Sequence, residues 1–179
     1  MRVIAGAFGG RTLRAPAGDA TRPTSDRVRE ALFSMLGALD GARVLDLYAG
    51  TGALGIEALS RGAAAAVFVE RDPRAVKVLR ANLEVLGLGR DRAEVRPGDA
   101  GQALRNARTG GEAYDLVLLD PPYKLAPALG PELGDDLQSL LTPGARVVAE
   151  SDRRAPLELA LPRTHLRRYG DTVIAIHSA

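Results

Sequence analysis

The segment Asp120-Pro121-Pro122-Tyr123 is the most specific feature of the sequence. Its prolines fix φ, restrict the preceding residue and remove two N–H donors, so the Asp120 carboxylate and the Pro121 carbonyl are held as acceptors. Two acceptors on a planar exocyclic amine favour a pyramidal nitrogen and aim its lone pair at an electrophile. Tyr123 offers a face on which a flipped base can stack. We predict a site that positions an NH2 group, more than a strong base; the alternative is a rigid loop with an incidental tyrosine.

A glycine-rich turn lies earlier in the chain, between Asp46 and Gly55 (DLYAGTGALG). Gly50 and Gly52 permit a tight turn and let the backbone approach a ligand before a helix begins. The spacing also fits G-x-G-x-x-G, which suits either a dinucleotide pyrophosphate or the methionine portion of S-adenosylmethionine. Asp46 favours the second ligand, because a carboxylate suits an ammonium group and is awkward beside a pyrophosphate. The alternative is a turn that only connects a strand to a helix.

Two further acids follow expected strands. Glu70 lies eighteen residues beyond Gly52, where a carboxylate can accept both hydroxyls of a ribose, as in NAD or S-adenosylmethionine. Its alternative role is a capping or surface acid beside Arg71. Asp99 could accept a hydrogen bond from an adenine amino group, but it is equally a good N-cap for the helix that follows.

Composition excludes several classes of protein. The chain has 179 residues and no cysteine, so disulfides, thiolate zinc sites, iron–sulfur clusters and cysteine nucleophiles are ruled out. His165 and His177 lack the spacing of metal ligands on one helical face, so we predict no metal. No apolar run approaches the ~20 residues of a membrane span, and residues 1–10 are too short and glycine-broken for a signal peptide. We expect a cytoplasmic, soluble, single-core protein without membrane association, acting as a monomer.

Strand and helix patterns alternate along most of the chain. An amphipathic helix is expected at 25–39, with Thr24, Ser25 or Asp26 as N-cap. The pattern then predicts strands at 43–47, 66–70, 93–96, 114–119 and 146–150, and helices at 53–60, 73–86, 100–107 and within 126–141. Near-continuous apolar strands separated by helices indicate a doubly wound α/β fold with a mostly parallel sheet. Residues 165–169 and 172–176 should close it as an antiparallel hairpin. Ligands of such folds bind beyond the carboxyl ends of the strands, where the residues above lie.

Residues 1–24 are predicted to form a basic N-terminal extension to a main domain at 25–179. Residues 1–29 hold six arginines against two aspartates, and short alternating stretches predict a small hairpin around 3–8 and 12–15. Such a segment is either a solvated tail or an element that contacts nucleic-acid phosphates.

Together these features resemble a known family. Residues 22–33 (RPTSDRVREALF), 44–62 (VLDLYAGTGALGIEALSRG) and 169–172 (YGDT), with the acids and the Asp120–Tyr123 segment, resemble class I S-adenosylmethionine-dependent methyltransferases. Among these, they resemble the bacterial small-subunit ribosomal RNA guanine-N2 methyltransferases of the RsmD type. The resemblance covers nearly the whole chain; Tyr48 stands where Phe is expected and Thr51 where Ser is common. It implies a Rossmann-like seven-stranded sheet, S-adenosylmethionine as cofactor, and a guanosine of 16S rRNA within the small subunit as substrate.

By position, the resemblance also implies roles for individual residues. The cofactor would be held by Thr24, Asp46, Tyr48, Gly50, Thr51 and Gly52, with Glu70 on its ribose and Asp99 and the Ala100 amide on its adenine. Asp120, Pro121, Pro122 and Tyr123 would hold the guanine, and Arg11, Arg22, Arg27 and Arg29 would lie on or near the RNA path. Three alternatives stay open: methylation of adenine N6 or an amide, an NAD-dependent dehydrogenase that leaves the Asp120–Tyr123 segment unexplained, and a non-catalytic RNA-binding module.

Overall fold

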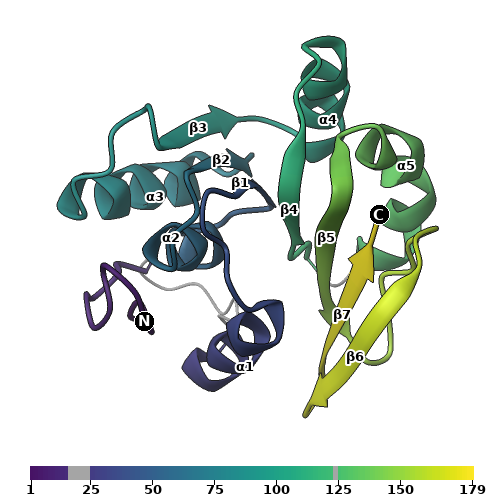
Figure 1. The fold of residues 1–179 in the computed structure, drawn as a ribbon, viewed down its shortest axis with the longest axis horizontal. Coiled ribbons are helices and arrows are strands. Elements are labelled where there is room, and N and C mark those ends of the chain that lie inside the picture. Colours follow the sequence, from purple (N-terminus) through teal and green to yellow (C-terminus); the bar gives the residue numbers. More distant parts are fainter. Residues whose placement is uncertain (16–24, 123–124) are drawn as a thin grey trace.

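One seven-stranded sheet, in the order β3-β2-β1-β4-β5-β7-β6, forms the centre of the computed structural model, which describes residues 1–15, 25–122 and 125–179 (Figure 1). The elements are α1 (Asp26–Leu36), β1 (Arg43–Leu47), α2 (Ala53–Ser60), β2 (Ala65–Glu70), α3 (Pro73–Val85), β3 (Ala93–Pro97), α4 (Ala100–Thr109), β4 (Tyr114–Leu119), α5 (Ala126–Gln138), β5 (Leu141–Asp152), β6 (Arg163–Tyr169) and β7 (Thr172–Ser178). Strands β1 to β5 are parallel, and β7 runs antiparallel to both of its neighbours, β5 and β6. The predicted doubly wound fold with a closing hairpin is confirmed.

Two element boundaries differ from the sequence pattern. Helix α1 ends at Leu36, three residues early, because Gly37 takes the left-handed φ of 69° as C-cap. Strand β5 starts at Leu141 although Pro143 and Gly144 have the composition of a turn. The strand continues through them because its pairing with β4 shifts register between Tyr114 and Leu116.

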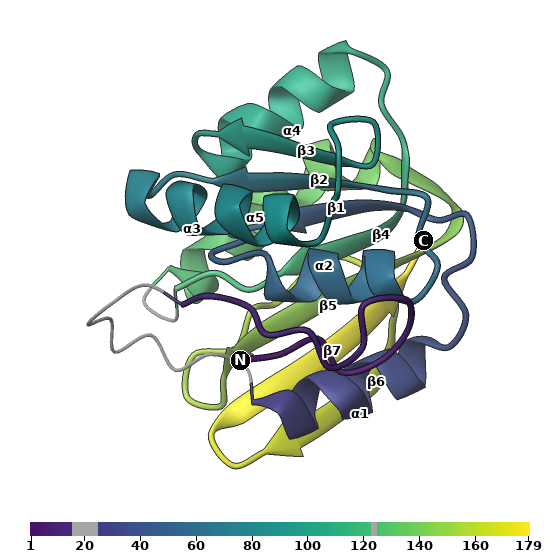
Figure 2. The same ribbon diagram turned by 90° about the vertical axis from the view of Figure 1, so that its left-hand side faces the viewer.

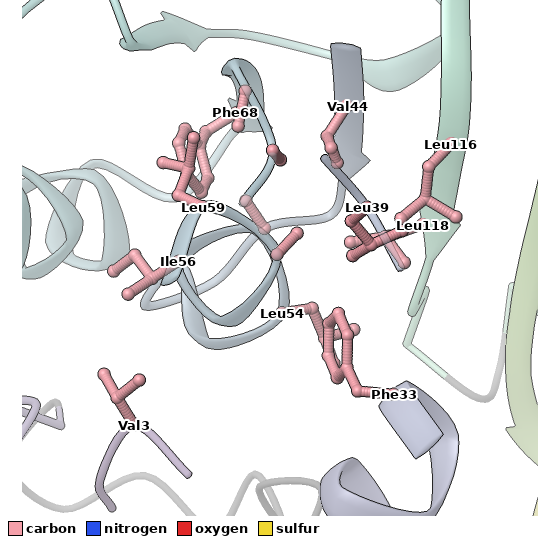
Figure 3. Close-up of a cluster of buried hydrophobic side chains, with 14 of the residues drawn as sticks. Val3, Phe33, Leu39, Val44, Leu54, Ile56, Leu59, Phe68, Leu116 and Leu118 are labelled. Carbon is pink, nitrogen blue, oxygen red and sulfur yellow. The ribbon is translucent and has the colours of Figure 1, made fainter. Parts of the chain in front are cut away.

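The alternation of side chains divides the core into two layers. Helices α1, α2 and α3 cover one face of the sheet, and α4 and α5 cover the other (Figures 1 and 2). Figure 3 shows the first layer, in which Phe33 of α1 lies beside Leu54 of α2 and Val3 of the N-terminal segment faces the same helix. Burying each of these side chains contributes about 1.5 to 3 kcal/mol.

Strand register sets the row of residues at the carboxyl edge. Leu47 of β1 pairs with both Val69 and Leu119, and Leu119 pairs with Ala149. The next position on each of these four strands therefore lies in one row, which contains Tyr48, Glu70, Asp120 and Glu150 in that chain order. The strand order reverses at β1, so this row crosses the topological switch point where ligands bind in such sheets.

The N-terminal segment, residues 1–13, folds back onto α2. Arg2 and Thr12 form an antiparallel bridge. The buried carboxylate of Glu57 accepts hydrogen bonds from the backbone of Ile4 at 2.7 Å and Ala5 at 3.1 Å. These contacts join the segment to the domain over more than fifty residues of sequence. The division at residue 24 stays a prediction, because residues 16–24 lie outside the described part.

A close approach at Gly6 completes the docking. Ala7 donates to the Ser60 carbonyl at 2.7 Å and Phe8 donates to the Ser60 hydroxyl at 2.9 Å. A Cβ on Gly6 would lie 1.8 Å from that carbonyl oxygen, and the φ of Gly6 is +83°. Only glycine permits this contact without displacement of the backbone.

We expect Gly6→Ala to detach the N-terminal segment from α2. Gly10→Ala is the matched control, because Gly10 has a φ of +81° but a Cβ added there would meet nothing within 4 Å. Both variants lose roughly 1 kcal/mol or more to left-handed strain. Gly6→Ala should lose about 2 kcal/mol beyond the control, since several docking hydrogen bonds are also lost. Urea denaturation and limited trypsin digestion measure both effects; equal losses in the two variants would contradict the docking.

Candidate active site

The turn from Tyr48 to Gly52 links β1 to α2 in a strained conformation. Tyr48 has a φ of 64°, and it alone has a positive φ among the described residues other than glycine. Such strain in a bulky residue is frequent at ligand sites. Gly52 donates to the Ala49 carbonyl at 2.7 Å and closes the turn. A Cβ on Gly50 would meet no atom of the described residues within 4 Å, so among these residues the turn leaves open space for a ligand on that side.

The other two glycines of the pattern serve packing. A Cβ on Gly52 would lie 2.3 Å from the Leu79 side chain, and one on Gly55 would lie 2.3 Å from the Phe68 ring. Their absence of side chains lets α2 approach β2 and α3 closely. The glycines of the G-x-G-x-x-G pattern therefore have two roles. Gly50 borders open space, whereas Gly52 and Gly55 permit close packing.

Glu70 joins three of the loops that follow strands. Its Oε2 accepts from the Gly50 N–H at 2.8 Å and its Oε1 accepts from the Asp72 N–H at 2.8 Å. Its backbone carbonyl accepts from the Gly98 N–H at 2.9 Å. A carboxylate has about four lone-pair sites, so each oxygen can accept one more hydrogen bond. The side chain predicted to bind a ribose thus stands beside the glycine turn with acceptor capacity left.

The loop before α4 has a capped helix start. The Asp99 side chain is the N-cap and accepts from the Gln102 N–H at 3.2 Å. At Gly98 beside it, a Cβ would have no atom of the described part of the chain within 4 Å, and Ala100 is the first residue of the helix. Asp99 therefore caps, and the contact of Asp99 and the Ala100 amide with adenine stays a prediction.

Asp46 lies buried beneath the glycine turn, with 1% of its surface exposed. Its Oδ2 accepts from the Gly55 N–H at 2.9 Å. Burial raises the pKa of Asp46 from 3.8 to about 7; the Gly55 hydrogen bond opposes this shift and repulsion from Glu70 adds to it. Asp46 is thus held against the start of α2. Its predicted contact with the ammonium group of a cofactor stays a prediction.

Asp120 shares its surroundings with two other carboxylates. Burial raises the pKa of Asp120 well above its usual value, and repulsion from Glu150 and Asp46 raises it further. Because side chains alternate along strands, all three carboxylates point to the face covered by α1, α2 and α3. Glu150, 3% exposed, is a site residue that sequence reasoning missed. Its position at the end of a predicted strand is the signal that could have found it.

We name Asp120–Tyr123 the acceptor segment; the structure describes its first three residues. Pro121 is buried and Pro122 is exposed. The Pro122 carbonyl accepts from the Leu125 N–H at 2.8 Å, which ties the segment to the start of α5. Tyr123 lies outside the described residues, as do Thr24 and Arg22.

The arginines predicted to contact RNA differ in exposure. Arg11 and Arg27 are exposed. Arg29 is completely buried, and its Nη2 donates to the Arg2 carbonyl at 2.6 Å and to Asp26 at 2.7 Å. An RNA phosphate cannot reach a guanidinium in that position, so the prediction for Arg29 is wrong.

Asn82 of α3 is a polar side chain that sequence reasoning also missed. It is 2% exposed. Its Nδ2 donates to the Thr51 carbonyl at 3.0 Å and to the Arg14 carbonyl at 3.2 Å, and its Oδ1 accepts from the Arg14 N–H at 2.8 Å. One side chain therefore joins the glycine turn to Arg14, the residue that follows the N-terminal segment. A lone Asn among the apolar positions of an amphipathic helix is the signal for it.

The described residues contain neither a metal-ligand cluster nor a membrane-spanning helix. No group of three or more His, Cys, Asp or Glu side chains in residues 1–15, 25–122 and 125–179 could hold a metal ion. No helix in those ranges has the length and apolar character needed to cross a bilayer.

Known proteins similar to this chain are rRNA methyltransferases or are provisionally described as methyltransferases. A family model described as "Conserved hypothetical protein 95" matches residues 1–178. YlbH of Bacillus subtilis, provisionally named an rRNA methyltransferase, is 44% identical over 184 residues, which cover 99% of this chain and 98% of that protein. Ribosomal RNA small subunit methyltransferase D of Escherichia coli is 39% identical over 125 residues, 69% of this chain and 61% of that protein. A solved structure of yhhF from Escherichia coli, provisionally described as a methyltransferase, has a TM-score of 0.83 and 32% identity, covering 99% and 97% of the two chains.

The raised pKa of Asp46 makes stability depend on pH. Between 3.8 and about 7 the folded state keeps a proton that the unfolded chain releases, so stability decreases as pH rises through this window. Asp46→Asn keeps an acceptor for the Gly55 N–H without the charge. We expect the free energy of unfolding of this variant not to fall as pH rises through the window, and to be about 2 to 4 kcal/mol higher than that of the wild type at pH 8. Urea denaturation from pH 4 to 8 measures it, with Asp91→Asn on the surface as control; parallel curves for Asp46→Asn and wild type would contradict the assignment.

Proposed function

Since the chain belongs to the RsmD-type methyltransferases, the family described as "Conserved hypothetical protein 95", we propose that it methylates the exocyclic N2 of a guanine in 16S ribosomal RNA. One observation carries the proposal. Asp120 follows Leu119, and Leu119 pairs with Leu47, which immediately precedes the glycine turn. The acceptor segment therefore lies next to the glycine turn. A planar amine held by the acceptor segment and a methyl donor held by the glycine turn would meet at the topological switch point between β1 and β4.

The residues around the turn fit S-adenosylmethionine. The backbone at Gly50 and Gly98 faces open space on the same edge of the sheet, and Glu70 lies between these loops with acceptor capacity for a ribose. Asp99 and the Ala100 amide follow for the adenine. When bound, the cofactor supplies an electrophilic methyl group on a sulfonium. A dinucleotide fits less well, because the buried carboxylate of Asp46 lies under the turn where a pyrophosphate would approach.

The chain's own groups orient the amine and receive its proton. The Asp120 carboxylate and the Pro121 carbonyl accept hydrogen bonds from the two N–H groups, which aims the nitrogen lone pair at the methyl carbon. As the C–N bond forms and the C–S bond breaks, the nitrogen must release one proton. Asp120 in its ionised form is the carboxylate placed to accept it, because it already accepts a hydrogen bond from this nitrogen. Positioning remains the larger contribution.

The substrate assignment rests on the family and on charge. The E. coli relative is named for the small ribosomal subunit, and segments 22–33 and 169–172 resemble the guanine-N2 enzymes. Arg11 and Arg27 are exposed and are proposed to contact the RNA backbone. Arg22, Thr24 and Tyr123 keep their proposed roles in RNA binding, cofactor binding and base stacking.

We expect Asp120→Ala to bind S-adenosylmethionine like the wild type and to lose about 100-fold or more in methyl transfer, because positioning of the amine is lost. Asp120→Asn is the matched variant, since it keeps one acceptor oxygen but no negative charge, and it should lose less. Calorimetric titration and single-turnover transfer of labelled methyl groups measure the two effects. Turnover near the wild-type rate in Asp120→Ala would contradict the proposed site.

The modified atom is identified by mapping the product. Small subunits and deproteinised 16S rRNA from a strain lacking the enzyme are incubated with labelled S-adenosylmethionine, and the RNA is digested for nucleoside mass spectrometry. We expect N2-methylguanosine at one position. N6-methyladenosine as the product would move the enzyme to adenine, and no labelled nucleoside from either RNA would overturn the proposed function.

A further inference from the structure

Two loops at the carboxyl edge are pinned together beyond the acceptor segment. The Arg153 N–H donates to the Asp171 carbonyl at 2.8 Å, and the two side chains form an ion pair at 3.5 Å. The Asp152 side chain accepts from the Arg154 N–H at 2.7 Å, and its carbonyl accepts from the Ala155 N–H at 3.0 Å. The end of β5 and the turn between β6 and β7 are therefore one fixed corner of the molecule.

Four exposed arginines gather at this corner. Arg153 and Arg154 follow β5, and Arg167 and Arg168 end β6. Strand β7 lies between β5 and β6. Arg167 pairs with Ile174, which also pairs with Glu150, so Arg167 points to the face of the carboxylates, and Arg168 points to the other face. Arg153 is paired with Asp171, whereas the other three form no ion pair with any residue that the structure describes. We name Arg153, Arg154, Arg167 and Arg168 the cationic corner.

The cationic corner lies close to the acceptor segment. Glu150, whose charge raises the pKa of Asp120, is only three residues before Arg153. A strand rises about 3.3 Å per residue, so Arg153 lies roughly 10 Å along the chain beyond Glu150, which is level with Asp120 in the sheet. Figures 1 and 2 show the turn between β6 and β7 near the start of α1, which carries the exposed Arg27.

We propose that the cationic corner binds phosphates of the RNA strand adjacent to the methylated nucleotide. The inference rests on the proposed function. Guanidinium groups match phosphate oxygens in bidentate geometry. Protection of an exposed sheet edge by charge would explain arginines on the edge strand β6. It does not explain Arg154, which lies in a loop whose backbone is fixed beside the site.

The test compares two double variants that each remove two positive charges. Arg154→Gln with Arg167→Gln removes two arginines of the cationic corner that form no described ion pair, and Arg167 points to the same face of the sheet as Glu150. Arg90→Gln with Arg163→Gln is the matched control, since both of those residues are exposed but lie at the opposite edge of the sheet, before β3 and at the start of β6. Binding of fluorescent deproteinised 16S rRNA is measured from 50 to 200 mM salt, with KM, kcat and S-adenosylmethionine affinity alongside.

We expect the corner variant to bind RNA about tenfold more weakly at low salt and to lose about 1 from the salt slope for each arginine that contacts phosphate. KM for RNA should rise with kcat and cofactor affinity unchanged, and the control should behave as the wild type. Equal RNA affinity and salt slope in the two variants would overturn the inference. Because binding is measured without turnover, this result is independent of the nucleoside mapping that tests the proposed function.

Discussion

The geometry of the site depends on hydrogen bonds that the single residue Glu70 accepts. Its carboxylate binds the N–H groups of Gly50 and Asp72, and its carbonyl binds that of Gly98. Three loops that follow neighbouring strands are thereby fixed relative to one another. Asn82 fixes the glycine turn from the other side, at the Thr51 carbonyl. The turn is thus held between a charged acceptor and a buried amide, which makes its strained conformation, including the positive φ at Tyr48, a stable feature.

Charge repulsion is built into the same edge of the sheet. Asp46, Asp120 and Glu150 point to one face at the ends of adjacent strands. Burial raises the pKa of Asp46 and of Asp120; repulsion from Glu70 adds to the shift of Asp46, and repulsion from Glu150 and Asp46 adds to that of Asp120. Such an arrangement costs stability in the free protein. Groups with perturbed pKa values gather at functional sites because chemistry needs them there. A cationic cofactor and a hydrogen-bond-donating amine would both relieve the repulsion, so ligand binding and the charge pattern support each other.

Much of the fold and of the site can be predicted from local patterns. Hydrophobic period places β1, α2 and β4, and the position after each strand identifies Glu70 and Asp120. The wrong prediction for Arg29 comes from counting charge without regard to helix face, although Arg29 shares a face with Leu32 and Leu36. Long-range contacts have no local signal: the bonds from Glu57 to Ile4 and from Asn82 to Arg14 span more than fifty residues. They are set by how elements pack, which no single segment encodes.

We propose that the Glu70 carboxylate both shapes the glycine turn and takes part in cofactor binding. Glu70→Gln tests it, because the amide keeps the size of the side chain but leaves one acceptor oxygen for the two N–H groups of Gly50 and Asp72. Calorimetric titration with S-adenosylmethionine, together with thermal unfolding, separates binding from folding. We predict at least tenfold weaker binding, about 1.4 kcal/mol, with Tm lowered by no more than a few degrees. Wild-type affinity in Glu70→Gln would contradict the account and leave Glu70 as a surface acid.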